Sequence, residues 1–218
     1  MADNDLEGFE KWRRSLCYWT GLGLTDGEKT RYEDNQRKRK IEMQCKKCID
    51  SKDRLLAYSP IVRFMKENVE LVKGNMDETS IVCRHCDKHQ SGGFHPNLGI
   101  VLCFNRLRNE KQVEDTLAHE MVHAYDHCRF EVDWANLRHH ACSEIRAASL
   151  SGECRWTREI GRSYFTFINH HQECVRRRAT LSVAAHPNCK DDAEAARIVN
   201  QVFETCFADT RPFAEIYR

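Results

Sequence analysis

The sequence predicts an α+β fold that is predominantly helical, with a small sheet placed before one long helix. Two observations predict it. Apolar residues recur at helical spacing in stretches spread over most of the chain. Short runs rich in isoleucine, valine and leucine, bounded by glycine and serine, occur between residues 79 and 105. A chain of 218 residues suits one domain, or one domain with a mobile arm, and can bury a sizeable core.

Charge and hydropathy argue against several classes of protein. The formal net charge is +1, so no overall electric field favours nucleic acid or an anionic membrane. The sequence contains no run of about 18 apolar residues, so we expect no transmembrane helix. The acidic start of the chain, over residues 1–7, resembles neither a secretory signal nor an arginine-rich transit peptide.

Residues 1–40 are expected to form a charged N-terminal arm that is partly flexible, ahead of a domain over residues 41–218. The arm is polar and shows only weak apolar periodicity. Residues 28–48 can form a helix, and its most basic run, Arg-Lys-Arg-Lys, occupies residues 37–40. Such a run is more often a solvated helix face than a nucleic-acid patch, and we interpret it as the former.

The elements that precede the long helix are a helix and two strands. Ser59-Pro60 is typical of a helix start, and an apolar stripe follows until a glycine-containing stop at residues 73–75. Strands are expected over residues 79–83 and 99–104, with a turn at residues 91–93 between them. A small sheet therefore comes just before the long helix.

The chain after residue 134 is expected to be helical. Apolar spacing predicts helices over residues 140–150, about 162–182 and 191–207. The sequence His-Pro-Asn at residues 186–188 separates the last two of these helices.

The long helix carries the motif H-E-x-x-H, in which the three specified residues are His119, Glu120 and His123. Each helical residue advances by about 100°, so the two histidines lie about 40° apart on one face. That spacing lets two imidazoles bind one zinc ion, while the neighbouring glutamate can take a proton from the attacking water. The motif therefore predicts a zinc-dependent hydrolase with Glu120 as its catalytic base.

The helix that carries the motif has a recognisable start and two different faces. Asn109 is a good N-cap residue, and Gln112 three residues later completes a capping-box pattern. The face opposite the two histidines is apolar and consists of Val113, Leu117, Met121, Ala124 and Cys128. One side is thus expected to pack into a core, while the other presents metal ligands.

A catalytic zinc ion usually takes a third protein ligand, and two carboxylates are the main candidates. Glu144 lies on a later predicted helix, and a glutamate on a later helix completes the site in one large class of H-E-x-x-H proteases. Asp126 lies about 20° from His119 on the same helix face, so it can either bind the metal or support a ligand from behind. His127 reaches the metal less easily. We favour Glu144 and keep Asp126 as the alternative.

The predicted domain is therefore a zincin-like metalloprotease, with Zn²⁺ as its cofactor. Two further parts of its site stay open. The group that stabilises the oxyanion is not identified by the sequence, and the candidates are Arg146, His139, His140, Tyr164, His170 and His171. The strand over residues 99–104 either pairs with an extended substrate or belongs to the core sheet.

Twelve cysteines without a targeting signal are unusual. In a reducing compartment such thiols would be explained by metal clusters, and in an oxidising compartment by disulfides. Composition does not decide between the two explanations.

Several longer stretches carry a resemblance to a known family. They comprise residues 91–94, 100–103, 115–129, 132–134, 141–147, 151–154, 174–176 and 202–207. Through them, roughly residues 40–218 resemble the mitochondrial inner-membrane metalloproteases that process an ATP synthase subunit. The metal-binding histidine pair and the catalytic glutamate of that family would correspond to His119, His123 and Glu120.

The resemblance implies a peripheral protein on the intermembrane-space side of the mitochondrial inner membrane. Its expected partner is the precursor of a mitochondrially encoded ATP synthase membrane subunit, whose presequence it would remove. The resemblance also implies help in assembling the ATP synthase, so a non-catalytic assembly factor with a zincin fold is the alternative function. No nucleic-acid partner is expected, and binding of the DNA-repair protein Ku is a minor possibility within the family.

The resemblance also bears on the cysteines. The intermembrane space has an oxidative import route, so five or six disulfides are expected there. Alternatively, the pairs Cys45–Cys48 and Cys83–Cys86 would form one four-cysteine zinc site, although their separation is longer than usual for such sites.

Overall fold

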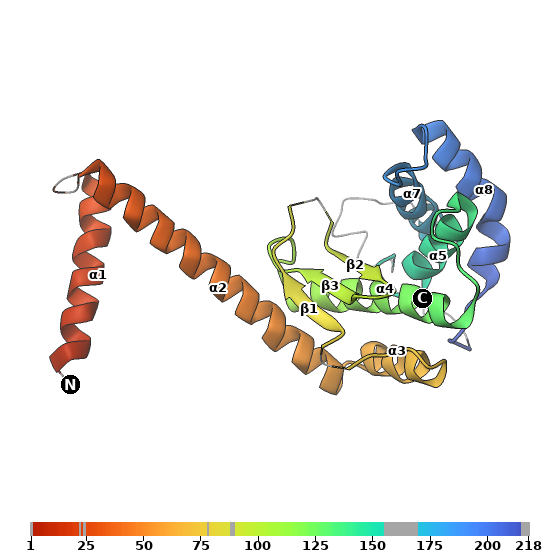
Figure 1. Ribbon diagram of the computed structural model, residues 1–218, viewed down its shortest axis with the longest axis horizontal. Coiled ribbons are helices and arrows are strands. Elements are labelled where there is room, and N and C mark those ends of the chain that lie inside the picture. Colours follow the sequence, from red (N-terminus) through yellow and green to blue (C-terminus); the bar gives the residue numbers. More distant parts are fainter. Residues whose placement is uncertain are drawn as a thin grey trace. The chain divides into compact units, whose positions relative to one another are not determined.

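A computed structural model describes residues 2–21, 23, 25–77, 79–87, 90–154 and 170–214 (Figure 1). Contacts divide the chain into two compact units, residues 1–46 and residues 47–218. The fold is mostly helical with one three-stranded sheet, so the predicted fold class is confirmed. In the part of the chain that is described, no helix has an apolar stretch long enough to cross a membrane.

The first unit is a helical hairpin. Helix α1 (Ala2–Thr20) is followed by a turn in which Gly21 and Gly23 adopt positive φ angles of 67° and 79°. Helix α2 (Asp26–Tyr58) begins with a capping box, because the Thr25 backbone N–H donates to Glu28 Oε2 over 2.8 Å. The predicted helix over residues 28–48 is therefore part of a longer one. The two helices are joined by a 2.6 Å bond between the hydroxyls of Ser15 and Tyr32.

The sheet of the second unit has the strand order β1-β3-β2. Strand β1 (Ile81–Arg84) is parallel to β3 (Gly99–Cys103), and β2 (Gly92–His95) is antiparallel to it. Gly99 starts the central strand with φ of 79°, and a Cβ there would lie 2.1 Å from the Ser80 carbonyl oxygen. Only glycine fits at this position. The sheet precedes the long helix, as predicted.

Two helices with well-defined N-caps follow the boundaries that the sequence predicts. Helix α3 (Pro60–Leu71) is capped by Ser59, and helix α4 (Glu110–Arg129) by Asn109, whose Oδ1 accepts from the Gln112 N–H over 2.9 Å. The Gln112 side chain accepts from the backbone N–H of Arg108 rather than that of Asn109. Helix α4 packs against α3, β2 and β3, and its apolar residues Val113, Leu117 and Met121 are buried.

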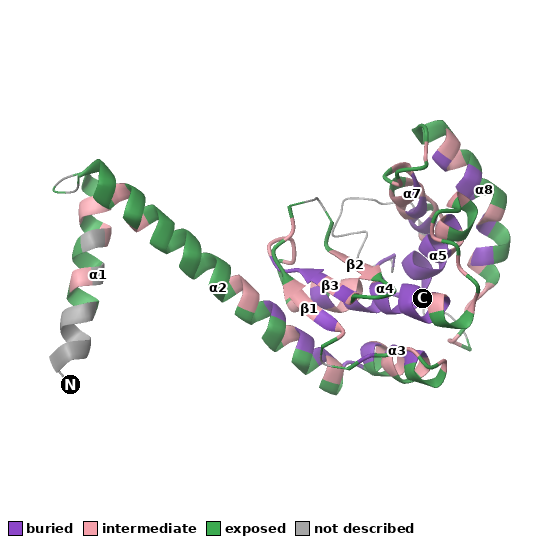
Figure 2. Ribbon diagram, in the orientation of Figure 1, coloured by how far each residue is buried: buried purple, intermediate pink, exposed green. Residues whose placement is uncertain are grey.

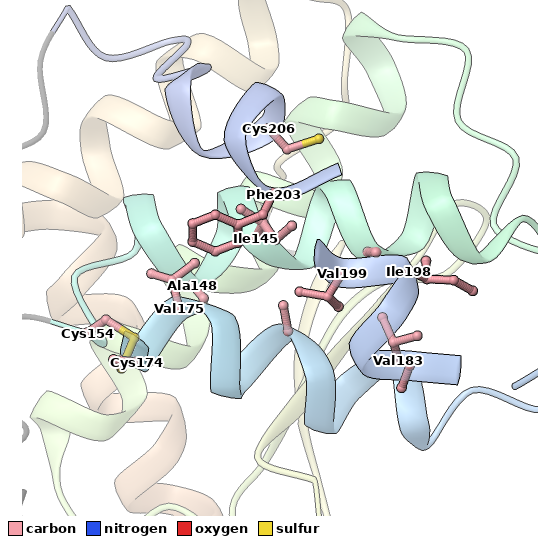
Figure 3. Packing of buried hydrophobic residues seen from close by; sticks show 13 residues of the cluster. Ile145, Ala148, Cys154, Cys174, Val175, Val183, Ile198, Val199, Phe203 and Cys206 are labelled. Carbon is pink, nitrogen blue, oxygen red and sulfur yellow. A yellow bond between two sulfur atoms is a disulfide. The ribbon is translucent and has the colours of Figure 1, made fainter. Parts of the chain in front are cut away.

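The C-terminal part is a cluster of three helices, α5 (Leu137–Leu150), α7 (His170–Ala184) and α8 (Asp192–Ala208). They pack on one another around Phe203 and Ile145, and α5 also packs on α4 (Figure 3). Figure 2 shows the buried residues concentrated on α4, α5 and the sheet. The predicted helix over residues 162–182 coincides with α7 from residue 170, and its first eight positions lie outside the described residues.

Four disulfides are present, and all twelve cysteines belong to the described residues. The bonded pairs are Cys48–Cys83, Cys86–Cys103, Cys142–Cys206 and Cys154–Cys174, while Cys17, Cys45, Cys128 and Cys189 are free thiols. The expectation of five or six disulfides is therefore wrong. So is the four-cysteine zinc site, because three of its ligands are held in disulfides. The reason is tertiary, since the fold joins Cys48 of α2 to Cys83 of β1, and Cys86 to Cys103 of β3.

The helical cluster yields a stability prediction at Phe203. Its ring is fully buried and lies beneath the Arg176 guanidinium, 3.5 Å from its carbon. We expect Phe203→Ala to lower the free energy of unfolding by about 3–5 kcal/mol, because the surrounding helices cannot fill the cavity. Urea denaturation measures this change. Leu98→Ala, at an exposed side chain, is the matched control, and an equal loss in both variants would contradict the packing described.

Candidate metal centre and cleft

Three of the predicted site residues meet at one point. His119 and His123 lie one turn apart on α4, and Glu144 reaches them from α5. The two Nε2 atoms are 3.1 Å apart, and the Glu144 carboxylate oxygens lie 3.6 Å from His119 Nε2 and 3.4 Å from His123 Nε2. Bonds of about 2.0–2.1 Å in tetrahedral geometry place neighbouring ligand atoms about 3.3–3.4 Å apart. The donor set and its spacing therefore fit zinc.

His123 is oriented by a chain of hydrogen bonds behind it. Its Nδ1 lies 2.8 Å from the Ser143 hydroxyl oxygen, and that hydroxyl lies 2.9 Å from Asp126 Oδ2. Because the serine donates to the carboxylate, its oxygen is left to accept from the Nδ1–H of the imidazole. The lone pair of His123 is then on Nε2, where a metal ligand needs it.

His119 is supported by Glu153, a residue that the sequence analysis did not assign to the site. Its Nδ1 lies 3.2 Å from Glu153 Oε1, and Arg178 donates to the other carboxylate oxygen over 2.6 Å. Burial alone would raise the pKa of Glu153, but His119 and Arg178 lower it to about 2. The carboxylate thus stays charged behind its histidine, as in many metal sites. Only the Ser-Gly-Glu-Cys stretch in the family resemblance pointed to this position.

Asp126, the alternative ligand, is not part of the cluster. It is buried and paired with Arg146, whose Nε and Nη2 lie 3.0 and 2.9 Å from its Oδ1. Arg146 also donates to the carbonyl oxygens of Asp209 and Arg211, over 2.6 Å each. Asp126 therefore contacts His123 through Ser143, while Glu144 lies directly beside both histidines.

The candidates for oxyanion stabilisation differ in whether they line the cleft. Arg146 is only 2% exposed, is paired with Asp126 and does not line the cleft, so the structure does not support this candidate. His139 and His171 do not line the cleft. They contact other groups instead, since His139 accepts from the Asp133 backbone N–H and His171 bonds to the Ser149 hydroxyl. His140 does line it, with Nε2 3.8 Å from Glu144 Oε1. Tyr164 and the His170 side chain lie outside the described residues.

Glu120 is buried beside the metal position, at the wall of the cleft. Burial raises its pKa, although the neighbouring histidines lower it in part. A raised pKa suits a carboxylate that must accept and return a proton near neutral pH. Strand β2 lies directly against this region, because a Cβ on Gly92 would be 2.6 Å from Thr116 Cγ2 and 3.3 Å from Glu120 Oε1. Glycine at residue 92 therefore lets the strand approach the Glu120 carboxylate.

These residues open into a cleft of about 690 Å³. Its walls come from β2, α4, α5 and α7, and its lining combines the rings of Phe94 and Trp134 with the guanidinium groups of Arg106, Arg108 and Arg178. The predicted strand over residues 99–104 cannot hold a substrate, because β3 is paired on both sides. The edge strand beside the cleft is β2.

The helical fold, the small sheet before the motif helix and the His-His-Glu cluster define a zincin-like peptidase. Residues 46–214 match the model of the peptidase M76 family, and the chain belongs to this family. It is 52% identical to the mitochondrial inner membrane protease ATP23 of Saccharomyces cerevisiae, over 100% of this chain and 99% of that protein. The proteins of the same name in Vanderwaltozyma polyspora and Aspergillus fumigatus are also 52% identical, over 98% and 95% of this chain. These alignments span 89% and 88% of those two proteins. No solved structure matches the chain.

Replacing the two competing carboxylates separates their roles. We expect Glu144→Ala to lose bound zinc, because it removes a ligand atom. Asp126→Asn should retain zinc but lower the free energy of unfolding by roughly 1–3 kcal/mol, because it removes one of the two carboxylates that pair with the buried Arg146 and leaves the Asp209 carboxylate, 2.8 Å away. Zinc content after dialysis and urea denaturation measure the two effects. Zinc loss in Asp126→Asn at unchanged stability would assign the ligand role to Asp126 instead.

Zinc binding should release a proton from His119. Burial by itself lowers the pKa of this imidazole, but Glu153 and Glu144 raise it well above the usual value. The metal-free histidine is therefore charged at neutral pH, and that stabilising charge pair is lost as pH rises through the raised pKa. Because a ligand imidazole must be neutral, we expect release of about one proton and weaker binding at lower pH. Calorimetry in buffers of different ionisation enthalpy counts the protons, and Glu153→Gln should lower the count.

Proposed function

We propose that this chain is a zinc metalloendopeptidase that holds Zn²⁺ through His119, His123 and Glu144. One observation carries the proposal, namely that these three ligands share a cleft with a buried glutamate and an edge strand. A zinc ion bound there would polarise the scissile carbonyl and acidify the attacking water.

Glu120 acts as the general base and then as the general acid. Its buried carboxylate lies beside the ligand cluster, and its raised pKa allows it to accept a proton from the attacking water. The same carboxylic acid then delivers that proton to the amine of the leaving peptide. His140 lines the cleft next to Glu144, and burial lowers its pKa, so it meets the substrate as a neutral imidazole. A neutral imidazole can donate one hydrogen bond to the developing oxyanion.

The outer edge of β2 supports binding of an extended substrate. The Cys103 N–H donates to the Ser91 carbonyl over 2.9 Å, which marks a hydrogen-bonded pair of this antiparallel ladder. Such pairs alternate, so Gly93 faces β3, whereas the backbone groups of Gly92 and Phe94 face the outer edge. No other strand among the described residues pairs with that edge. A peptide added there would pass the Glu120 carboxylate.

The names of the relatives support a mitochondrial role. Because they are called mitochondrial inner membrane proteases, we place this chain at the same membrane, as a peripheral protein on its intermembrane-space side. The substrate we propose is the precursor of a mitochondrially encoded ATP synthase membrane subunit. The four disulfides agree with an oxidising compartment. The alternative is an assembly factor for the same membrane sector that needs the fold but not the cleavage.

Glu120→Gln tests the enzyme directly. We expect it to keep the fold and the bound zinc and to lower the rate of precursor cleavage by about 10²- to 10⁴-fold, because amide nitrogen cannot take the proton. Incubation of the precursor with each protein, followed by N-terminal sequencing of the product, measures cleavage. Wild-type protein treated with a chelator should also be inactive and should recover with added zinc.

Two results would contradict the proposal. Cleavage by Glu120→Gln at the wild-type rate would show that Glu120 is not the general base. Full support of ATP synthase assembly by Glu120→Gln, with a wild-type protein that cleaves no precursor, would favour the assembly factor.

A further inference from the structure

Helix α1 exposes, between residues 9 and 19, an apolar stripe that the proposed chemistry does not use. Phe9, Trp12, Leu16 and Trp19 are 56%, 59%, 47% and 85% exposed. At about 100° per residue, the four side chains fall within about 80° of one face. The rings of Phe9 and Trp12 lie 5.8 Å apart, so the stripe is continuous at that point. We call these four residues the α1 stripe.

The α1 stripe is not the face that joins α1 to α2. That contact uses Ser15 and Tyr18, since Ser15 bonds to the Tyr32 hydroxyl and the Tyr18 hydroxyl donates to Glu33 over 2.8 Å. The rings of Tyr18 and Tyr32 add a contact at 4.9 Å. None of the described side chains of α1 is buried (Figure 2). The hairpin therefore forms without covering the stripe.

Clustering distinguishes this stripe from ordinary surface apolar residues. In the second unit, strongly exposed large apolar side chains such as Tyr58, Leu71 and Leu98 come from separate elements and loops. Single exposed apolar residues are normal on proteins, whereas three aromatic rings and a leucine on one helix face indicate an interaction surface.

The charged residues of α1 and α2 indicate the kind of partner that the α1 stripe would contact. Residues 11–20 contain three basic residues and no acidic one, and the four acidic residues of α1 precede residue 11. One of the four, Glu10, pairs with Arg13 over 2.9 Å, which leaves the other two basic residues to attract an anionic surface. In α2, residues 35–47 contain six basic residues against one acidic residue, and the side chains of residues 37–40 are exposed. Tryptophan and phenylalanine on one face, with lysine and arginine elsewhere on the helices, match a helix that lies in the interface of an anionic membrane.

We propose that the first unit docks the protein onto an anionic phospholipid membrane, with the α1 stripe inserted into the headgroup region and residues 37–40 near the lipid phosphates. The inference rests on the proposed function for the identity of the membrane, but the docking itself does not require catalysis. It gives a role to residues 1–46, which contribute no residue to the cleft of the second unit. It adds a role to residues 37–40, whose exposed side chains agree with the solvated helix face that the sequence predicts.

Flotation of the full chain with lipid vesicles tests the proposal. Wild-type protein should float with vesicles of equal parts phosphatidylcholine and phosphatidylglycerol, and less with pure phosphatidylcholine or at high salt. The double variant Trp12→Ala, Trp19→Ala should bind about tenfold more weakly or worse, because it removes two rings from the interface. Leu71→Ala combined with Leu98→Ala, which also removes two exposed apolar side chains, should bind as wild type. Neutralising residues 37–40 to glutamine should weaken binding to the anionic vesicles by about tenfold or more.

A spectroscopic readout locates the contact independently of affinity. Lipids with brominated acyl chains should quench the tryptophan fluorescence of the wild type. Trp12→Phe with Trp19→Phe should keep vesicle binding and lose most of that quenching, because Phe retains the apolar ring.

Three results would overturn the proposal: wild-type protein that does not float, stripe variants that bind as wild type, or a concentration-dependent dimer that the stripe variants abolish. Cleavage of a soluble peptide should be unchanged in the Trp12→Ala, Trp19→Ala variant. Loss of docking with intact cleavage, and loss of cleavage with intact docking in Glu120→Gln, are therefore separate outcomes.

Discussion

In the zinc site that we propose, the imidazoles of His119 and His123 must present unprotonated Nε2 atoms to the same point, and several contacts of the second unit serve this requirement. The Nε2 atoms of His119 and His123 are 3.1 Å apart, a separation at which two lone pairs repel unless a cation or a proton lies between them. Each ring is therefore held from behind by an acceptor, Glu153 for one and Ser143 for the other. The two supporting carboxylates, Glu153 and Asp126, are themselves paired with Arg178 and Arg146.

These supports come from elements that are distant along the chain, and the disulfides and the helical core keep them together. The Cys154–Cys174 bond lies next to Glu153 and joins the end of α5 to α7, the helix that carries Arg178. By closing a loop of this size, a disulfide contributes about 3 kcal/mol in the chain-entropy model. Arg146 joins α4, α5 and the segment after α8 in the same way, but through hydrogen bonds to Asp126 and two carbonyls. Catalytic geometry and fold stability thus depend on the same contacts.

In our proposals, the second unit carries the peptidase chemistry and the first unit binds the membrane. The match to the M76 family model begins at residue 46, where the contacts also divide the chain, so the model covers the cleft and leaves out the hairpin. The Saccharomyces cerevisiae relative nevertheless aligns over the whole chain, hairpin included. The part of the chain that precedes the peptidase cleft therefore has a counterpart in that relative.

The sequence by itself determined what depends on local spacing. The helical period places His119 and His123 on one face, and cap chemistry sets the start of α4 at Asn109. It also predicted a small sheet ahead of that helix. Only the tertiary structure decided the roles that depend on distant contacts: Glu144 rather than Asp126 beside the histidines, Glu153 as a support, four disulfides, and β2 rather than β3 at the cleft. The physical reason is that one turn of helix fixes neighbours three or four residues apart, whereas contacts across 20 or 34 residues follow from how whole helices pack.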